Sequence, residues 1–222
     1  MNIVVIDSGK GGRNFIEKFN KKDIKVKFCK ISYLKSDPFG IVSFNSKEYI
    51  RNHILETINN YSCKNTSYII MACHTVSSCI LDLLLKNCNM LNNIRIFEPI
   101  VPVCEYIKEK KYKKILVLST IKTARVRWHE RILSDSNIIV EYISFPQLDM
   151  KIENHKGSIE ESLERLKRKS EFIKECDGVV LGCTHYNVIK DDILKSLKMY
   201  NFRGDLIDSN VVLYKYFMKS IK

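Results

Sequence analysis

The chain has 222 residues, 45% of them hydrophobic, with 37 basic and 25 acidic side chains and a formal charge of +12. This hydrophobic content is enough for a compact core in one large or two small domains. The sequence has no apolar stretch of about 18 residues and no secretory signal ahead of Asp7. We therefore expect a cytoplasmic protein with no membrane association. The basic residues are mostly scattered lysines without interleaved aromatic side chains, which does not favour nucleic-acid binding, although a positive field would attract a dicarboxylate.

Short β-branched runs alternate with amphipathic patterns along the chain. The expected strands are 3–6, 26–29, 68–71, 94–97, 115–118, 138–143, 179–181 and 206–207. The expected helices are 46–60, 76–86, 101–109, 159–174 and 188–199. This alternation predicts an α/β fold with mostly parallel sheets flanked by helices. In such sheets ligands bind beyond the carboxyl ends of the strands.

Small, polar and nucleophilic residues follow four of these strands. They are Asp7-Ser8-Gly9-Lys10-Gly11-Gly12, Ala72-Cys73-His74-Thr75, Gly182-Cys183-Thr184-His185 and Asp208-Ser209. The two cysteines are 110 residues apart (183 minus 73), about half the chain, and each follows an apolar strand and precedes a helical pattern. We therefore predict two similar lobes, residues 1–95 with 205–222 and residues 96–204, each offering one thiol to an active site in the cleft between them.

Two opposed thiols suit the transfer of a proton from one face of an α-carbon to the other. One thiolate abstracts the proton while the other thiol donates, because one group rarely reaches both faces. A free thiol is mostly protonated at neutral pH, so each needs help from a neighbour or from a helix N-terminus. His185 follows Cys183 by two residues, and Asp7 would reach Cys73 from a neighbouring strand end.

Other chemistries fit the same residues less well. The glycine turn 9–12 could cradle a carboxylate or phosphate, but it lacks the spacing of a dinucleotide site or a P-loop. Cys183 and His185 could form half of a protease-like pair or a metal site, yet the remaining groups cannot be assembled from the spacing. The other cysteines lie mostly in apolar runs, and without a Cys-x-x-Cys pair we read them as reduced, buried thiols.

At these residues the sequence resembles the glutamate racemase family of the aspartate/glutamate racemase superfamily. The matching segments span nearly the whole chain in the family's order. They are Asp7-Ser8-Gly9-Lys10-Gly11-Gly12, Pro38-Phe39-Gly40, Ala72-Cys73-His74-Thr75, Thr120-Ile121-Lys122-Thr123, Leu181-Gly182-Cys183-Thr184-His185-Tyr186 and Ile207-Asp208-Ser209.

The resemblance implies a racemase that interconverts L- and D-glutamate without a metal, pyridoxal phosphate or nucleotide. It implies that Cys73 and Cys183 are the two bases, assisted by Asp7 and His185. The implied substrate-binding residues are Ser8, Phe39, Gly40, His74, Thr75, Thr123 and Thr184, with Phe39-Gly40 and Thr123 at the distal carboxylate. The amino-acid substrate would be the main partner, and a homodimer is a candidate assembly because relatives often form dimers. In a walled bacterium the D-glutamate would be a peptidoglycan precursor.

The sequence also departs from the family pattern. His74 stands where Asn usually follows the first cysteine, Phe39 replaces Tyr, and Asn187 replaces a frequent Pro. His185 and the Pro-Phe-Gly turn favour glutamate over aspartate. Two further hypotheses stay open. The first is a racemase for aspartate or for a broader set of amino acids. The second, suggested by His74, is an inactive carboxylate-binding or interaction protein on a racemase scaffold. The surroundings of Cys183 match the family more closely than those of Cys73.

Overall fold

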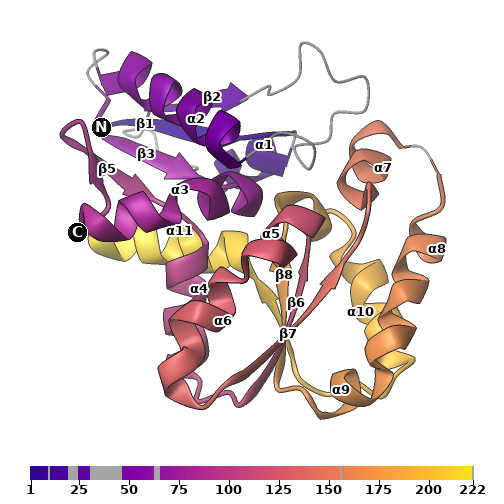
Figure 1. Cartoon of the computed structure of the whole chain (residues 1–222). Coiled ribbons are helices and arrows are strands. Elements are labelled where there is room, and N and C mark those ends of the chain that lie inside the picture. Colours follow the sequence, from indigo (N-terminus) through magenta and orange to yellow (C-terminus); the bar gives the residue numbers. More distant parts are fainter. Residues whose placement is uncertain (10, 20–24, 31–46, 63–65, 156, 222) are drawn as a thin grey trace. The chain divides into compact units, whose positions relative to one another are not determined.

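The computed structural model describes residues 1–9, 11–19, 25–30, 47–62, 66–155 and 157–221. The chain forms two compact units, Met1–Pro99 with Leu213–Lys222 and Ile100–Val212. Each unit has a mostly or fully parallel sheet flanked by helices (Figure 1), which confirms the predicted fold class. None of the helices in the described ranges is long and apolar enough to span a membrane.

The first unit has a sheet of order β2-β1-β3-β5-β4. Its strands are β1 (Asn2–Asp7), β2 (Lys25–Lys30), β3 (Tyr68–Met71), β4 (Met90–Leu91) and β5 (Ile94–Phe97). All neighbours pair in parallel except β4 and β5, which are antiparallel. Ile6 pairs with Met71, so Asp7, the last residue of β1, and Cys73, two residues after β3, lie at the carboxyl ends of adjacent strands.

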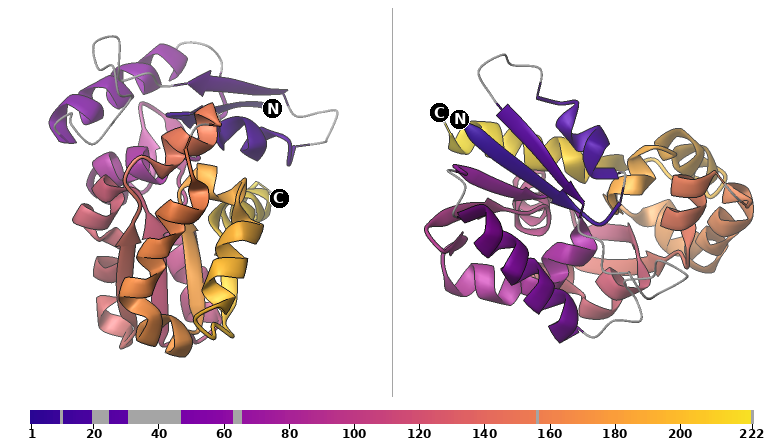
Figure 2. Two further views of the ribbon diagram at one scale, coloured as in Figure 1. Left: turned by 90° about the vertical axis from the view of Figure 1, so that its right-hand side faces the viewer. Right: turned by 90° about the horizontal axis from the view of Figure 1, so that it is seen from above.

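Helices cover both faces of this sheet (Figure 2). Helix α1 (Gly11–Ile16) and the second half of α11 (Ser209–Ser220) lie on one face, and α2 (Lys47–Ser62) and α3 (His74–Lys86) lie on the other. The predicted turn over residues 9–12 is wrong in its second half, because Gly11 and Gly12 are the first two residues of α1. On the α1 and α11 face, Phe97 and Phe217 pack edge to face with ring centroids 4.9 Å apart, a favourable geometry for aromatic rings.

The second unit has a fully parallel sheet of order β7-β6-β8-β9. Its strands are β6 (Lys114–Ser119), β7 (Ile139–Ser144), β8 (Gly178–Gly182) and β9 (Asp205–Asp208). Strand β8 is buried along its whole length, as expected of a central strand covered on both faces. Its carboxyl end carries Cys183.

The helices of the second unit lie on both sides of its sheet (Figure 1). One side has α4 (Ile100–Glu109), α5 (Ile121–Val126) and α6 (Trp128–Leu133). The other has α8 (Ile159–Leu163), α9 (Ser170–Glu175) and α10 (Lys190–Lys198). Helix α7 (Leu148–Asn154) and the short 3₁₀ segments η1 (Ser134–Ser136), η2 (Glu164–Lys169) and η3 (Thr184–Asn187) complete the unit.

The predicted single helix over 159–174 is wrong, because the structure divides this region into α8, η2 and α9. The sequence of η2 brings Arg165 within three and four residues of Arg168 and Lys169. Like charges at these spacings destabilise an α-helix. The tighter 3₁₀ segment still places Leu166 in the core of the unit.

Candidate functional site

The first thiol lies in the first unit, at the end of β3. Cys73 is the N-cap of α3 with extended backbone, and its side chain is 6% exposed. Its Sγ lies 3.2 Å from Ser8 Oγ, which follows β1. Asp7 is fully buried beside it, and its Oδ1 accepts a hydrogen bond from the Gly9 amide at 2.8 Å. The fold thus brings Asp7, Ser8 and Cys73 together at one strand edge.

These surroundings favour the protonated form of Cys73. Burial raises the pKa of the Cys73 thiol to about 12, and the charge of the Asp7 carboxylate adds to the rise. Hydrogen bonds from Ser8 and from the amide of Val76 act in the opposite direction and lower the pKa. Because burial and Asp7 dominate, this thiol is better suited to hold a proton than to lose it.

The predicted neighbours of Cys73 begin helix α3. His74 and Thr75 are its first two residues, and both side chains are buried. The carbonyl of His74 accepts a hydrogen bond from Ser78 Oγ at 2.5 Å, and the carbonyl of Cys73 accepts one from Ser77 Oγ at 2.9 Å. The predicted binding residues Phe39 and Gly40 lie outside the described residues.

The second thiol lies in the second unit, between β8 and η3. Cys183 is 7% exposed, and its Sγ lies 3.8 Å from Nδ1 of His185. The other ring nitrogen, Nε2, lies 2.9 Å from Oε2 of Glu153 on α7. The thiol, the imidazole and the carboxylate therefore form a continuous chain of proton-exchanging groups. The helix expected directly after Cys183 is only the single turn η3, and α10 begins at Lys190.

Glu153 determines how the imidazole can act. A carboxylate accepts a hydrogen bond, so it favours the tautomer with the proton on Nε2. In that tautomer Nδ1 carries the lone pair and can take the proton of the Cys183 thiol. The resulting imidazolium would be stabilised by Glu153 on one side and by the thiolate on the other. Sequence reasoning named His185 but missed Glu153.

A second carboxylate lies one turn before Glu153 on the same side of α7. Asp149 is half-buried, and burial raises the pKa of its carboxyl, while the charge of His185 lowers it and that of Glu153 raises it. Burial also raises the pKa of the Tyr186 phenol well above its ordinary value, with further contributions from Cys183 and Asp149. The Tyr186 hydroxyl donates to the Ser119 carbonyl at 3.2 Å. Asp149 was also missed by sequence reasoning.

Two predicted threonines also lie in the second unit. Thr184 is buried at the start of η3. Thr123 lies in α5, where its amide donates to the Thr120 side chain at 3.4 Å and the two hydroxyl oxygens are 3.2 Å apart. Helix α5 follows β6, which pairs with β8, so the Thr120 turn and Cys183 leave adjacent strands. Their hydroxyls are suited to hold a carboxylate.

The matched segment Ile207-Asp208-Ser209 has a structural role in the second unit. Asp208 Oδ1 accepts hydrogen bonds from the amides of Asn210 at 2.8 Å and Val211 at 3.0 Å. This contact caps the start of α11. The hydroxyl of Ser209 donates to the carbonyl of Leu181 on β8, two residues before Cys183. These residues therefore hold the strand end that carries the thiol.

Over the described ranges, no group of three or more His, Cys, Asp or Glu side chains is arranged to bind a metal ion. Seven of the eight cysteines are described, and none of these seven is in a disulfide.

Comparison with known proteins places this geometry in a family. No protein-family model matches the chain. The glutamate racemase of Aquifex pyrophilus is 30% identical over 220 residues, covering 96% of this chain and 80% of that protein. Its solved structure matches with a TM-score of 0.74 at 25% identity, over 100% of this chain and 84% of that one. Glutamate racemase from Francisella tularensis, solved in complex with D-glutamate, matches with a TM-score of 0.77 at 22% identity, covering 99% and 80% of the two chains. The chain belongs to the glutamate racemase family.

Proposed function

We propose that this amino-acid racemase interconverts L- and D-glutamate, with Cys73 and Cys183 as the two bases. The observation that carries the proposal is that each thiol is buried at the carboxyl end of a parallel strand beside its own proton-exchanging neighbours. For Cys183 these are His185 and Glu153, and for Cys73 they are Ser8 and Asp7. The similarity to glutamate racemases supports the choice of substrate.

In the proposed reaction one thiolate takes the α-proton of the substrate. The electron pair left on the α-carbon is delocalised into the α-carboxylate, and the opposite thiol donates its proton to the other face. When the product leaves, the cysteine that took the α-proton is protonated and the cysteine that donated its proton is deprotonated. His185 with Glu153 and, on the other side, Asp7 then exchange protons to restore the starting state.

The predicted binding residues have separate roles in this proposal. Ser8, Thr75 and Thr184 hold the amino and α-carboxylate groups, and His74 lies next to the amino group. Phe39 and Gly40 hold the distal carboxylate, with Thr123 in support. The proposed steps use only side chains of this chain. A homodimer and a cytoplasmic location stay predictions from the sequence.

The test uses single Cys73→Ser and Cys183→Ser variants with L-glutamate and with D-glutamate in D₂O. General acid–base groups contribute on the order of 10²–10⁴-fold to a rate, so we expect each variant to lose activity by about 10²-fold or more. C79S and C176S are the matched controls, since both replace a buried cysteine, one in each unit, and both should keep full activity.

Two internal checks sharpen this experiment. The enantiomers are equally stable, so kcat/KM must be equal in the two directions for every active variant. Two-base transfer also predicts solvent deuterium at the α-carbon of early product while unreacted substrate keeps its proton. Full racemisation in both directions by both single variants would disprove the mechanism.

An amino-acid panel followed by circular dichroism decides the substrate. Faster racemisation of aspartate than of glutamate would favour the aspartate alternative. Binding of glutamate without any deuterium exchange would instead indicate a binding protein on a racemase scaffold.

A further inference from the structure

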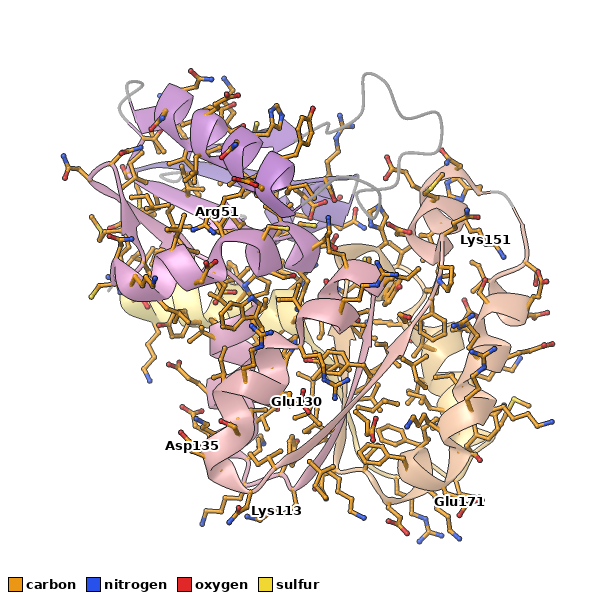
Figure 3. The ribbon with its side chains drawn as sticks, in the orientation of Figure 1. Arg51, Lys113, Glu130, Asp135, Lys151 and Glu171 are labelled. Carbon is orange, nitrogen blue, oxygen red and sulfur yellow. The ribbon has the colours of Figure 1, made fainter. Side chains whose placement is uncertain are left out.

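The lysine on helix α7 contacts the start of α8. Lys151 Nζ donates to the Ser158 carbonyl at 3.2 Å and to Ser162 Oγ at 3.0 Å. Ser162 Oγ donates in turn to the Ser158 carbonyl at 3.2 Å, which closes a small polar ring. Figure 3 labels Lys151 on α7. Its third partner, Glu161, lies 3.7 Å away with a 74% exposed side chain, so that ion pair contributes little.

The stem of Lys151 is also packed. A Cβ built on Gly157 would lie 3.3 Å from Lys151 Cε, and Gly157 has a φ of +83°. The chain thus turns back against the lysine at a position that suits glycine. Ser158 is the N-cap of α8, and a helix N-terminus disfavours a positive charge. The helix dipole therefore does not favour the Lys151 ammonium at this position. Its hydrogen bonds to Ser158 and Ser162 do.

Helix α7 needs such contacts because it is short. It has seven residues and is bounded by Gln147 and His155, both in the left-handed region. A helix of this length is not stable by itself. Leu148 and Ile152 are its two buried residues, so polar contacts on the flanks of the helix add to what fixes its rotation about its own axis.

Lys151 and Glu153 lie on opposite flanks of α7 and contact different elements. They are two residues apart and so project about 200° apart around the helix, on either side of the buried residues. Glu153 contacts His185 on η3 and Lys151 contacts α8. A rotation that releases Lys151 would carry Glu153 away from the imidazole.

We propose that Lys151 is a positioning residue, which holds α7 so that Glu153 stays in hydrogen-bond contact with His185. The proposal rests on the proposed function for its effect on rate, but the contact itself does not. Lys151→Met keeps the stem and removes the ammonium, and it should lower kcat about tenfold with KM nearly unchanged, as is usual for loss of an outer hydrogen-bond partner. Lys151→Arg should restore most of the activity.

The matched control is Lys169→Met, which removes the ion pair with Glu141 Oε2 at 3.2 Å in the same unit. It should keep kcat. A second readout, independent of activity, is the imidazole titration of His185 by NMR, with the signal assigned through His185→Gln. A looser carboxylate contact favours the imidazolium less, so the midpoint should move to lower pH in K151M and stay in place in K169M.

Several outcomes would overturn the proposal. One is a K151M variant whose kcat and His185 titration both equal those of K169M. If K151M does not fold, Ser162→Ala leaves the lysine in place and removes one of its acceptors. An unchanged His185 titration in S162A would then reject the positioning role of Lys151. A wild-type protein without racemase activity would reject the proposed function, whereas the NMR comparison would still decide the role of Lys151.

Discussion

Glu153 Oε2 lies 2.9 Å from Nε2 of His185, although 32 residues separate the two in the chain. Glu153→Gln keeps the size of the side chain and removes its charge. We expect kcat to fall about 10- to 100-fold, because the amide no longer stabilises an imidazolium and no longer fixes one tautomer. Steady-state kinetics in both directions would measure this, with KM nearly unchanged.

Glu141→Gln is the control for this change, since it alters a carboxylate paired with a lysine in the same unit. It should leave kcat unchanged. An E153Q variant with wild-type kcat would show that the thiol–imidazole pair works without its carboxylate.

Asp7→Asn should separate the acidity of Cys73 from its activity. Burial and the Asp7 charge raise the pKa of Cys73 to about 12, so removing the charge should lower that pKa and let alkylation of the thiol begin at lower pH. Racemisation should nevertheless fall, because a proposed proton-exchanging neighbour is lost. The alkylation of Cys73 against pH can be followed by peptide mass spectrometry.

Asp82→Asn, in the same unit on α3, is the control for the Asp7 experiment. It should leave the pH dependence of Cys73 alkylation as it is in the wild type. If D7N did so as well, the carboxylate would not influence the thiol.

His129 should make stability fall in mild acid. Its side chain is fully buried, and burial lowers the pKa of His129 from 6.5 to about 4. Between these values the unfolded chain binds a proton that the folded chain does not, so stability is complete above pH 6.5 and is lost as pH falls toward about 4, by about 3 kcal/mol in total. Urea unfolding at several pH values measures the slope.

His129→Gln should flatten this part of the stability curve. The exposed His155 of the same unit provides the control, and His155→Asn should keep the wild-type slope while it tolerates the left-handed backbone. An equal slope in H129Q and wild type would assign the acid sensitivity to other groups.

Gly182→Ala should be more harmful than Gly178→Ala, although both lie on β8. A Cβ at Gly182 would lie 2.8 Å from the backbone oxygen of Leu118, whereas at Gly178 the nearest atom is the flexible end of Ile207 at 2.9 Å. Overpacking of this kind costs about 1–3 kcal/mol. Unfolding free energies should order the two variants, and G182A should also lose activity because the next residue is Cys183.

Much of this fold could be predicted from the sequence. The β-branched runs located most of the strands, because a strand covered on both faces must be apolar throughout, as β8 is. The polar residues directly after these strands located both thiols, since a parallel sheet gathers its carboxyl ends at one edge. Asp7 and Ser8 beside Cys73 follow from the pairing of β1 with β3.

The partners of His185 could not be predicted in this way. Glu153 and Asp149 lie on α7, which is too short to show a helical period and is bounded by Gln147 and His155 instead of the usual glycine or proline signals. Only the tertiary packing of α7 against η3 brings these carboxylates to the imidazole. The 3₁₀ interruption at η2 likewise depends on like charges that a hydrophobic pattern ignores.

The contacts of Asp208 and Ser209 show that a segment can match the family for a structural reason and not a catalytic one. These residues hold the ends of β8 and β9 and the start of α11, so they serve the fold of this unit whether or not the chain moves a proton. A chain that kept both and lost Cys73 and Cys183 would keep the strand ends without any group to move a proton. In choosing variants for a designed binder of D-amino acids, Asp208 and Ser209 should therefore be left alone, and the two thiols are the positions to change.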